Sequence, residues 1–193
     1  FDVEVVYVDL DSCGNVKETH LEELLKTSEK KTLVSLMHVN NEIGNKLDIK
    51  KVGQLCKEHG AIFHSDCVQS VGHYDLDFSE IPVDFTAVSA HKFHGPKGVG
   101  FAFIRKNSGL KPLIFGGEQE RGHRAGTEGV HNIVGLEEAL KLSLDNLAEE
   151  KAYISDLKAH FISKLKAEIP GVKFNGDCSD LEKSTYTLVN VCL

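Results

Sequence analysis

Residues 32–67 read TLVSLMHVNNEIGNKLDIKKVGQLCKEHGAIFHSDC. The stretch opens with an apolar run at 32–39 that is typical of a buried strand, and it closes with a second such run at 61–67. The segment between the two runs has the spacing of an amphipathic helix. A strand, a helix and a strand in this order predict two parallel strands joined by a crossover.

The expected helix carries its own start and stop signals. Val52, Leu55 and Cys56 fall on one helical face. Asp48 precedes them at the position of an N-cap, where its carboxylate can accept a hydrogen bond from a free backbone N–H. Gly60 follows at the position where a left-handed residue commonly ends a helix. We therefore expect the helix between Asp48 and Gly60.

The same alternation extends on both sides of this unit. Upstream, residues 3–10 are expected to form a strand, and Leu21, Leu24 and Leu25 mark the apolar face of a helix. Downstream, further strands are expected at 84–90 and 99–104. Strands that alternate with helices predict an α/β fold with a mainly parallel sheet covered by helices.

The pattern changes at Val130, where one long helical region begins. Pro170 and Gly171 are expected to end it. A helix of this length at the edge of an α/β unit often bridges two domains, so we predict a boundary near Ala148. Residues 1–148 would then belong to one domain, and residues 149–193 would start another. The chain also begins and ends within expected strands, so we expect it to be an internal segment of a longer protein.

Composition narrows the class of partner. The 193 residues are 41% hydrophobic and 26% charged, with 22 basic and 29 acidic side chains and a net charge of −7. This charge disfavours binding to nucleic acid or to an anionic membrane, since both need clustered Lys and Arg. No apolar run approaches the roughly 20 residues of a membrane helix.

Five cysteines are present, and none forms a C-x-x-C pair. An odd set without that spacing indicates reduced thiols and a cytoplasmic protein.

Polar residues gather where the expected strands end. In open α/β sheets, ligands bind outside the carboxyl ends of the strands, and these ends should meet at one crevice. The three ends read HVNNE at 38–42, HSD at 64–66 and SAHK at 89–92.

Lys92 is followed by the glycine-rich turn FHGPKG at 93–98. Such a turn can bring backbone close to a ligand and present amide groups to an anion, although it lacks the spacing of a Walker loop. Lys92 is either a solvated lysine on a tight connection or an amine that forms a Schiff base.

Asp66 ends a strand that is otherwise apolar, so its carboxylate needs a cationic partner or several donors. A structural ion pair or a helix cap would satisfy it, and so would a protonated pyridine nitrogen, as in pyridoxal phosphate sites. If the chain turns helical after Asp66, Gln69 faces the same way. Cys67 should point to the opposite side and is a poor candidate for a nucleophile.

The histidines near these strand ends allow an alternative interpretation. His64, Asp66, His91 and His94 could together bind a metal ion, although this leaves Lys92 and its glycine-rich turn unexplained.

The loop at 116–128 is polar and rich in glycine and precedes a helix N-terminus. It is either a mobile surface loop or a binding segment, for an anion or for the site of a neighbouring subunit.

Four ordered motifs carry a family resemblance. They are MHVNNEIG at 37–44, HSDCVQ at 64–69, SAHKFHGPKG at 89–98 and QERGHRAGTE at 119–128. Together they resemble the class V aminotransferase family, and within it the NifS/IscS-type cysteine desulfurases. The resemblance runs over almost the whole chain. It implies a fold type I enzyme that uses pyridoxal 5′-phosphate. Residues 1–148 would be the C-terminal part of its large cofactor-binding domain, and residues 149–193 the start of a smaller α+β domain.

The resemblance also implies an activity. Such an enzyme removes sulfur from L-cysteine, giving L-alanine and an enzyme persulfide for iron–sulfur or thio-cofactor assembly. It acts as a homodimer and passes sulfur to acceptor or scaffold proteins. Alternatives within the family are a selenocysteine lyase or another aminotransferase or lyase. A non-catalytic or metal-binding domain of the same fold is the alternative of a different class.

Site residues carry over by position. The resemblance makes Lys92 the catalytic Schiff-base lysine, Asp66 the partner of the pyridinium nitrogen, and Gln69 a donor to the phenolic oxygen of the ring. Ser89 and His91 would hold the phosphate.

Two more residues carry over from loops. Asn41 would contact the cofactor or the substrate carboxylate, and Thr127 would reach the phosphate of the partner subunit in the homodimer. The family's ring-stacking His, persulfide Cys and substrate-carboxylate Arg would lie outside residues 1–193. We therefore expect the 193-residue piece alone to be inactive.

The sequence also departs from the family pattern. Ala90 stands where a Gly is usual, Cys67 and Val68 where smaller residues are common, and Glu118 where a Gly is frequent. These changes concern specificity more than cofactor binding.

Overall fold

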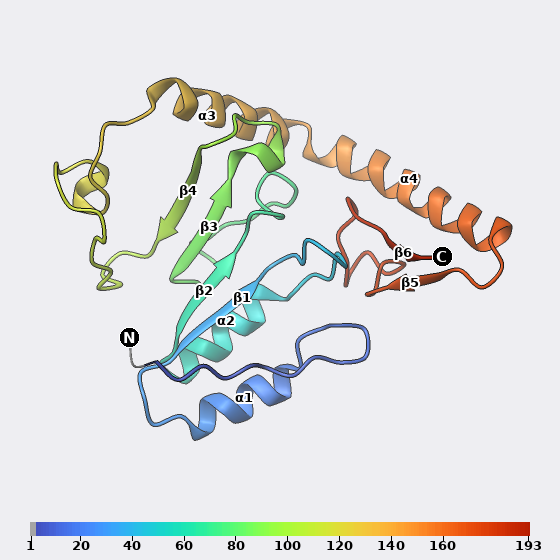
Figure 1. Ribbon diagram of the computed structural model, residues 1–193, viewed down its shortest axis with the longest axis horizontal. Helices are drawn as coiled ribbons and strands as arrows, with labels where there is room; N and C mark the ends of the chain where they lie inside the picture. Colours follow the sequence, from blue (N-terminus) through green and yellow to red (C-terminus); the bar gives the residue numbers. More distant parts are fainter. Residues whose placement is uncertain (1–2) are drawn as a thin grey trace.

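The computed structural model describes residues 3–193. Within them, a four-stranded sheet with its helices is joined by a long helix to a two-stranded sheet (Figure 1). The helices are α1 (Glu18–Thr27), α2 (Ile49–Glu58), α3 (Val130–Asp145) and α4 (Leu147–Glu168), with short 3-10 helices η1 (Ala90–Phe93) and η2 (Glu120–Gly122). The strands are β1 (Leu33–Met37), β2 (Ile62–Asp66), β3 (Phe85–Ser89), β4 (Gly100–Ile104), β5 (Lys173–Asn175) and β6 (Asn190–Cys192).

The main sheet has the order β1-β2-β3-β4. The first three strands are parallel, and β4 runs antiparallel to β3. α2 connects β1 to β2 as predicted, and the Asp48 side chain caps it by accepting from the backbone N of Lys51 at 3.0 Å. The prediction of a mainly parallel α/β sheet is confirmed.

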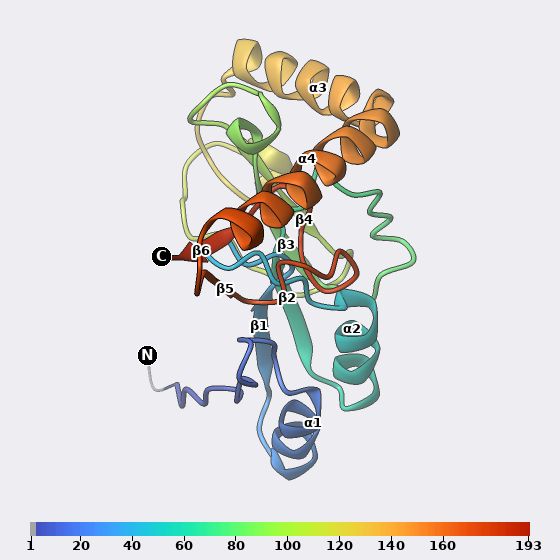
Figure 2. The ribbon, with the colours of Figure 1, turned by 90° about the vertical axis from the view of Figure 1, so that its right-hand side faces the viewer.

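Helices cover one face of this sheet. Val34 and Phe63 are buried there with Leu21 of α1 and Val52 of α2. α3 lies against the same face farther along, where Leu136 packs beside the buried residues Cys67, Val88 and Phe93. Figure 2, turned from the view of Figure 1, shows α1 and α2 on this side. Burial of these apolar side chains supplies the main driving force for folding this layer.

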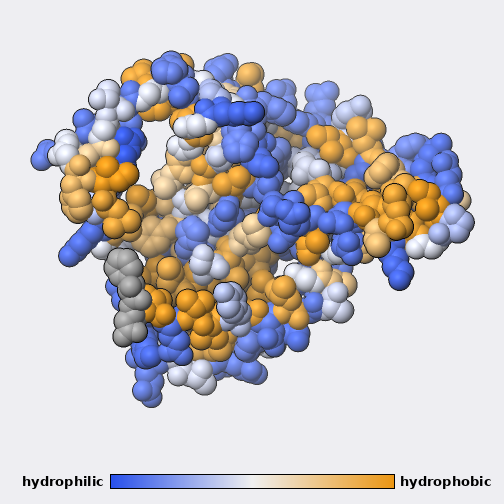
Figure 3. All heavy atoms as spheres, viewed as in Figure 1, coloured by the Kyte–Doolittle hydropathy of each residue, from blue (hydrophilic) through white to orange (hydrophobic). Residues whose placement is uncertain are grey.

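The opposite face of the sheet is open. Because side chains alternate along a strand, Ser35, His64 and Asp66 point away from the helices. Ser35 is exposed, and the other two are half-buried. Figure 3 shows a gap beyond β4, between the segment 105–129 and the rest of the molecule. Asp66 is half-buried, so part of its side chain remains accessible on the open face.

The strand predicted at residues 3–10 is wrong. Among the described residues of this segment, Leu10 alone makes a β-bridge, with Val16. Val3, Val5 and Tyr7 are exposed by 70%, 69% and 85%. An alternating apolar pattern becomes a strand only where a neighbouring strand supplies hydrogen bonds. In the described chain, only Asp9 and Leu10, at the end of this segment, meet such a neighbour.

The long helical region predicted from Val130 is present but breaks at Asn146. This residue ends α3 and begins α4, and its φ of −100° and ψ of 3° are not helical. Its side-chain Nδ2 donates to the Leu142 carbonyl at 2.8 Å, which fastens the break to α3. No helix within residues 3–193 is both long and apolar enough to cross a membrane.

A buried lysine joins α4 to the end of the chain. Lys158 is 5% exposed, and its Nζ donates to the Ser184 hydroxyl at 3.1 Å and to the Thr185 carbonyl at 2.5 Å. The same segment reaches the loop after β1, where Thr185 N donates to the Gly44 carbonyl at 2.8 Å. The C-terminal segment is thus held between α4 and the carboxyl end of the main sheet.

Gly53 provides a test of the packing of α2. Alanine in place of a helical glycine normally stabilises a protein by about 1 kcal/mol. At Gly53, however, a Cβ would stand 2.5 Å from the backbone carbonyl oxygen of Pro82. We expect Gly53→Ala to lower the free energy of unfolding by about 1–3 kcal/mol, measured by urea denaturation. The exposed neighbour Gln54→Ala should change it by less than about 0.5 kcal/mol. A Gly53→Ala protein as stable as the parent would contradict the close approach of α2 to Pro82.

His38, directly after β1, is buried as a neutral ring. It is 6% exposed, its ring lies 5.9 Å from that of Tyr74, and its Nδ1 has no hydrogen-bond partner among the described residues. Burial, and after it the nearby charge of Lys46, lower the pKa of His38 from 6.5 to about 4. Protonation therefore favours the unfolded chain.

This shift predicts a pH dependence of stability. The contribution of neutral His38 is complete above pH 6.5 and is lost as the pH falls toward about 4. At about 1.4 kcal/mol for each unit of pKa, the loss is roughly 3 kcal/mol. Between pH 7 and 4, the free energy of unfolding from urea denaturation should fall less for His38→Leu than for the parent. For the exposed His160→Leu, it should fall as much as for the parent. Parallel curves for His38→Leu and the parent would refute the assignment.

Candidate functional site

The register of the parallel strands brings their carboxyl ends side by side. Met37 pairs with Asp66, and Asp66 pairs with Ala87. Beyond the strands the ladder continues, because His38 N donates to the Asp66 carbonyl at 2.9 Å and Cys67 N donates to the Ala87 carbonyl at 3.0 Å. The predicted meeting of strand ends is present in the structure.

Asp66 stands at the end of β2 on the open face. Its Oδ1 accepts a hydrogen bond from the backbone N of Val68 at 2.9 Å, which turns the chain after the strand. Oδ2 receives no hydrogen bond from residues 3–193, and no cationic side chain of that range forms an ion pair with Asp66. One carboxylate oxygen thus remains available to a donor on the open face.

Lys92 follows β3 on η1. Ser89 is the last residue of β3, and its Oγ lies 3.2 Å from Nδ1 of His91, the residue before Lys92. The short helix closes when Gly95 N donates to the Ala90 carbonyl at 2.9 Å, with His94 in a left-handed conformation at φ 67°. A hydroxyl, an imidazole and an amine are therefore carried on four successive residues at the end of one strand.

The remaining predicted residues lie on loops. Gln69 is half-buried in the turn after β2. Asn41 is exposed after β1, and its Nδ2 donates to Glu42 Oε1 at 2.7 Å. Thr127 is exposed on the segment 105–129, and no hydrogen bond joins it to any of the other predicted site residues. The structure thus carries Ser89, His91 and Lys92 at the end of β3, the strand that pairs with β2 at Asp66, and no hydrogen bond joins Thr127 to them.

One polar pair escaped the sequence analysis as a site feature. Ser35 Oγ lies 2.9 Å from His64 Nδ1, and the two residues are register partners on the open face. His64 lies two residues before Asp66 on β2, so both point to this face. Because side chains alternate along a strand, the sequence could have placed His64 on the same face as Asp66.

Cys67 points to the helix-covered side, as predicted. It is fully buried among Val71, Val88 and Phe93, and burial raises the pKa of its thiol. A thiol with a raised pKa and no access to solvent is a poor nucleophile. Cys56 and Cys178 are also buried, whereas Cys13 is half-buried and Cys192 is exposed.

The alternative metal site does not assemble. Within residues 3–193, no three side chains of His, Cys, Asp or Glu are arranged to hold one metal ion. His64 is engaged with Ser35, and His91 with Ser89. The four residues considered for such a site are therefore not gathered around a common point.

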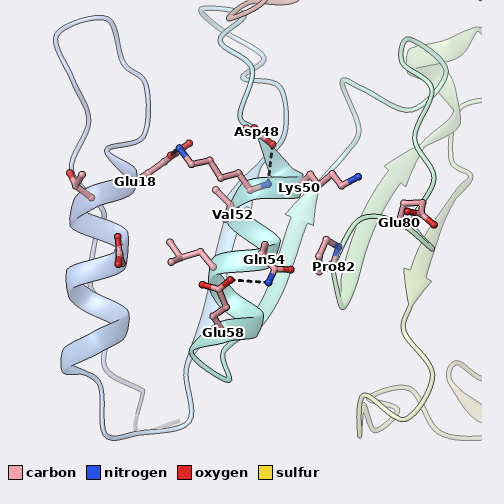
Figure 4. A pocket seen from close by; sticks show the side chains of 12 residues that line it. Glu18, Asp48, Lys50, Val52, Gln54, Glu58, Glu80 and Pro82 are labelled. Carbon is pink, nitrogen blue, oxygen red and sulfur yellow. Dashed lines mark hydrogen bonds and ion pairs between the residues drawn. The ribbon is translucent and has the colours of Figure 1, made fainter.

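Two hollows of the structure lie away from these residues. One lies between α1 and α2 and is lined by charged side chains such as Glu18, Asp48 and Lys50 (Figure 4). The other lies near the start of β2, beside Lys57 and Arg105. Neither is lined by Asp66, Ser89 or Lys92. Of the strand-end residues, His91 is exposed, and Asp66 and Lys92 are half-buried.

Comparison with known proteins identifies relatives over most of the chain. It is 43% identical over 173 residues to cysteine desulfurase IscS of Clostridium botulinum, covering 90% of this chain and 43% of the relative. A solved NifS-like protein matches with a TM-score of 0.90 and 37% identity, over 98% of this chain and 51% of the other. A structure of SspA in complex with cysteine matches with a TM-score of 0.78 and 30% identity, over 98% and 51% of the two chains.

The chain spans about half the length of these relatives. The NifS-like neighbour confirms the predicted fold type, since the two folds agree over nearly all of this chain. Residues 2–193 match the family described as aminotransferase class V. The strand-end arrangement of Asp66 and Lys92 thus occurs in a chain that belongs to the class V aminotransferase family.

Proposed function

We propose that this chain is part of a pyridoxal-phosphate-dependent cysteine desulfurase. The observation that carries the proposal is the register that sets Asp66 beside β3, whose end leads into Ser89, His91 and Lys92. Membership of the class V aminotransferase family and similarity to IscS support it. The substrate would be L-cysteine, and the products L-alanine and a persulfide on the enzyme.

The residues present fit this cofactor. The free oxygen of Asp66 can accept from a protonated ring nitrogen, since it receives no hydrogen bond from the described chain. Ser89 and His91 offer a hydroxyl and an imidazole to a phosphate, beside the backbone N–H groups of the glycine-rich turn. Gln69 and Asn41 would add amide groups to the ring and to the substrate carboxylate.

Each of these side chains would have a defined task. Bound here, pyridoxal phosphate would supply a sink for the electrons left when a bond at the substrate Cα breaks. Lys92 would attach the cofactor through Nζ and then carry the Cα proton on the same atom. Asp66 would keep the ring nitrogen protonated, because a carboxylate stabilises the charged form of a neighbouring base.

Sulfur transfer needs an accessible thiolate, which the buried Cys56, Cys67 and Cys178 do not offer. Cys13 and Cys192 are more accessible, but they lie before α1 and on β6, distant in sequence from Asp66 and Lys92. We therefore assign the persulfide to a cysteine outside residues 1–193. The product sulfur would pass to acceptor or scaffold proteins for iron–sulfur or thio-cofactor assembly in the cytoplasm.

The proposal includes a homodimer and two domains. Thr127 would serve the phosphate of the partner subunit, which agrees with its exposure and its separation from the other site residues. Residues 1–148 would belong to the large domain and residues 149–193 to the small one. The packing of α3 on η1 and of Lys158 on the C-terminal segment supports a boundary near Ala148.

Lys92 provides the first test. Borohydride reduction of the full-length protein with pyridoxal phosphate, followed by peptide mapping, should place the label on Lys92. Lys92→Ala should abolish turnover and retain noncovalent cofactor. The control Lys97→Ala, exposed in the same turn, should retain labelling. Label on any other lysine of the parent protein would reject the assignment.

Asp66 provides the second test. Asp66→Asn keeps the shape of the side chain and removes the charge that stabilises the protonated ring, which we take as about 3 kcal/mol. Turnover of cysteine should fall on the order of a hundredfold, while the cofactor dissociation constant changes far less. Steady-state kinetics and absorbance titration measure the two quantities. Near-normal turnover in Asp66→Asn would rule out the role.

The chain alone provides the third test. The 193-residue piece with pyridoxal phosphate, L-cysteine and a dithiol reductant should release no sulfide in a colorimetric assay. The full-length protein should release it, because the dithiol reduces the enzyme persulfide. The buried cysteines of the piece cannot reach a substrate on the open face, and Cys13 and Cys192 are distant in sequence from the candidate site residues. Sulfide release that disappears in Cys67→Ala or Cys178→Ala would show that the nucleophile lies within the piece.

A further inference from the structure

His73 contacts the backbone of the proposed catalytic lysine. Its Nε2 lies 3.0 Å from the carbonyl oxygen of Lys92, although the two residues are 19 positions apart. A carbonyl oxygen can only accept a hydrogen bond, so Nε2 must carry the hydrogen. The imidazole therefore donates to the peptide group that follows Lys92 and fixes its direction.

The turn that carries His73 packs directly on η1. Gly72 has a φ of 83°, and a Cβ at this position would stand 2.5 Å from Cβ of Phe93. His73 N and Tyr74 N both donate to the Ser70 carbonyl at 3.0 Å, which fixes the turn internally. A rigid turn in contact with the residue after Lys92 can hold the imidazole in place.

Tyr186 contacts the other side of the same imidazole. Its hydroxyl lies 3.4 Å from His73 Nδ1 and donates to the His73 carbonyl at 3.2 Å. Tyr186 is 3% exposed and packs edge-on against Tyr74, with ring centroids 5.8 Å apart. Burial raises the pKa of Tyr186 to about 12, so the hydroxyl remains a donor at physiological pH.

The Tyr186 segment is itself held firmly. The preceding Thr185 accepts a hydrogen bond from the buried amine of Lys158 and donates its own N–H to Gly44. These contacts join α4 and the loop after β1 to Tyr186. A continuous set of contacts thus runs from α4 through Tyr186 and His73 to the backbone of Lys92.

We propose that His73 is a positioning residue: it holds the Lys92 carbonyl and, through Tyr186, couples the C-terminal segment to the turn that carries the lysine. The contacts that support it are independent of any cofactor. The coupling acts on catalysis only if Lys92 is the lysine that binds the cofactor, and this role rests on the proposed function. In that role, His73 would set the direction from which the lysine approaches the open face of the sheet.

Four variants of the full-length protein test the coupling. His73→Leu removes the donor to Lys92, and Tyr186→Phe removes only the hydroxyl. His73→Gln keeps an N–H that can reach the Lys92 carbonyl and serves as the conservative rescue. His160→Leu, an exposed histidine on α4, is the control. Urea denaturation of each variant establishes that it folds, and Tyr186→Phe carries the test if His73→Leu does not fold.

The first measurement is amide hydrogen exchange of the peptide covering residues 90–98, without added cofactor. His73→Leu and Tyr186→Phe should exchange on the order of tenfold faster there. The first removes the hydrogen bond to the Lys92 carbonyl, and the second removes the hydroxyl that holds His73 in place. His73→Gln and the control should match the parent. Unchanged exchange in Tyr186→Phe, or no rescue by His73→Gln in a folded series, would overturn the coupling.

The second measurement is the dissociation constant for pyridoxal phosphate, titrated by visible absorbance. It should rise several-fold in His73→Leu and Tyr186→Phe and remain at the parental value in His73→Gln. If hydrogen exchange shows the coupling but borohydride labels a lysine other than Lys92, the proposed function is refuted and the coupling stands. Conversely, label on Lys92 together with unchanged exchange in Tyr186→Phe would refute the coupling alone.

Discussion

Parallel pairing of β1, β2 and β3 is the constraint on which the site depends. In a parallel sheet all carboxyl ends lie at one edge, so the polar residues that follow each strand share that edge without any further device. Helices cover only one face of this sheet, where Phe63 and Val52 are buried. Asp66 lies on the other face and stays partly accessible. Loss of this register would move every candidate residue at once.

Much of the fold could be predicted because its signals are local. The Asp48 cap, the apolar face with Val52 and the run at 61–67 each depend on residues within one turn or one strand. Residues 3–10 failed for the converse reason: their alternation is that of a strand, but the neighbour that would pair with them is not in the described chain. The break at Asn146 also escaped, because the apolar pattern continues through it while a single backbone conformation interrupts the helix.

The candidate site was predictable to the extent that it follows strand ends. Asp66, Ser89 and Lys92 could be placed on the same edge from the order of strands alone. The contact between His73 and Tyr186 could not, since it joins residues 113 positions apart through two short turns. Sequence spacing carries no information on such contacts, which arise only when the C-terminal segment packs on the sheet.

The outer position of β1 has a consequence for solubility. In the described chain β1 pairs on one side only, with β2, and Leu33 on it is 60% exposed. An unpaired strand edge with apolar side chains is a template for association with other chains. The 193-residue piece by itself is therefore open to association with other chains through this edge.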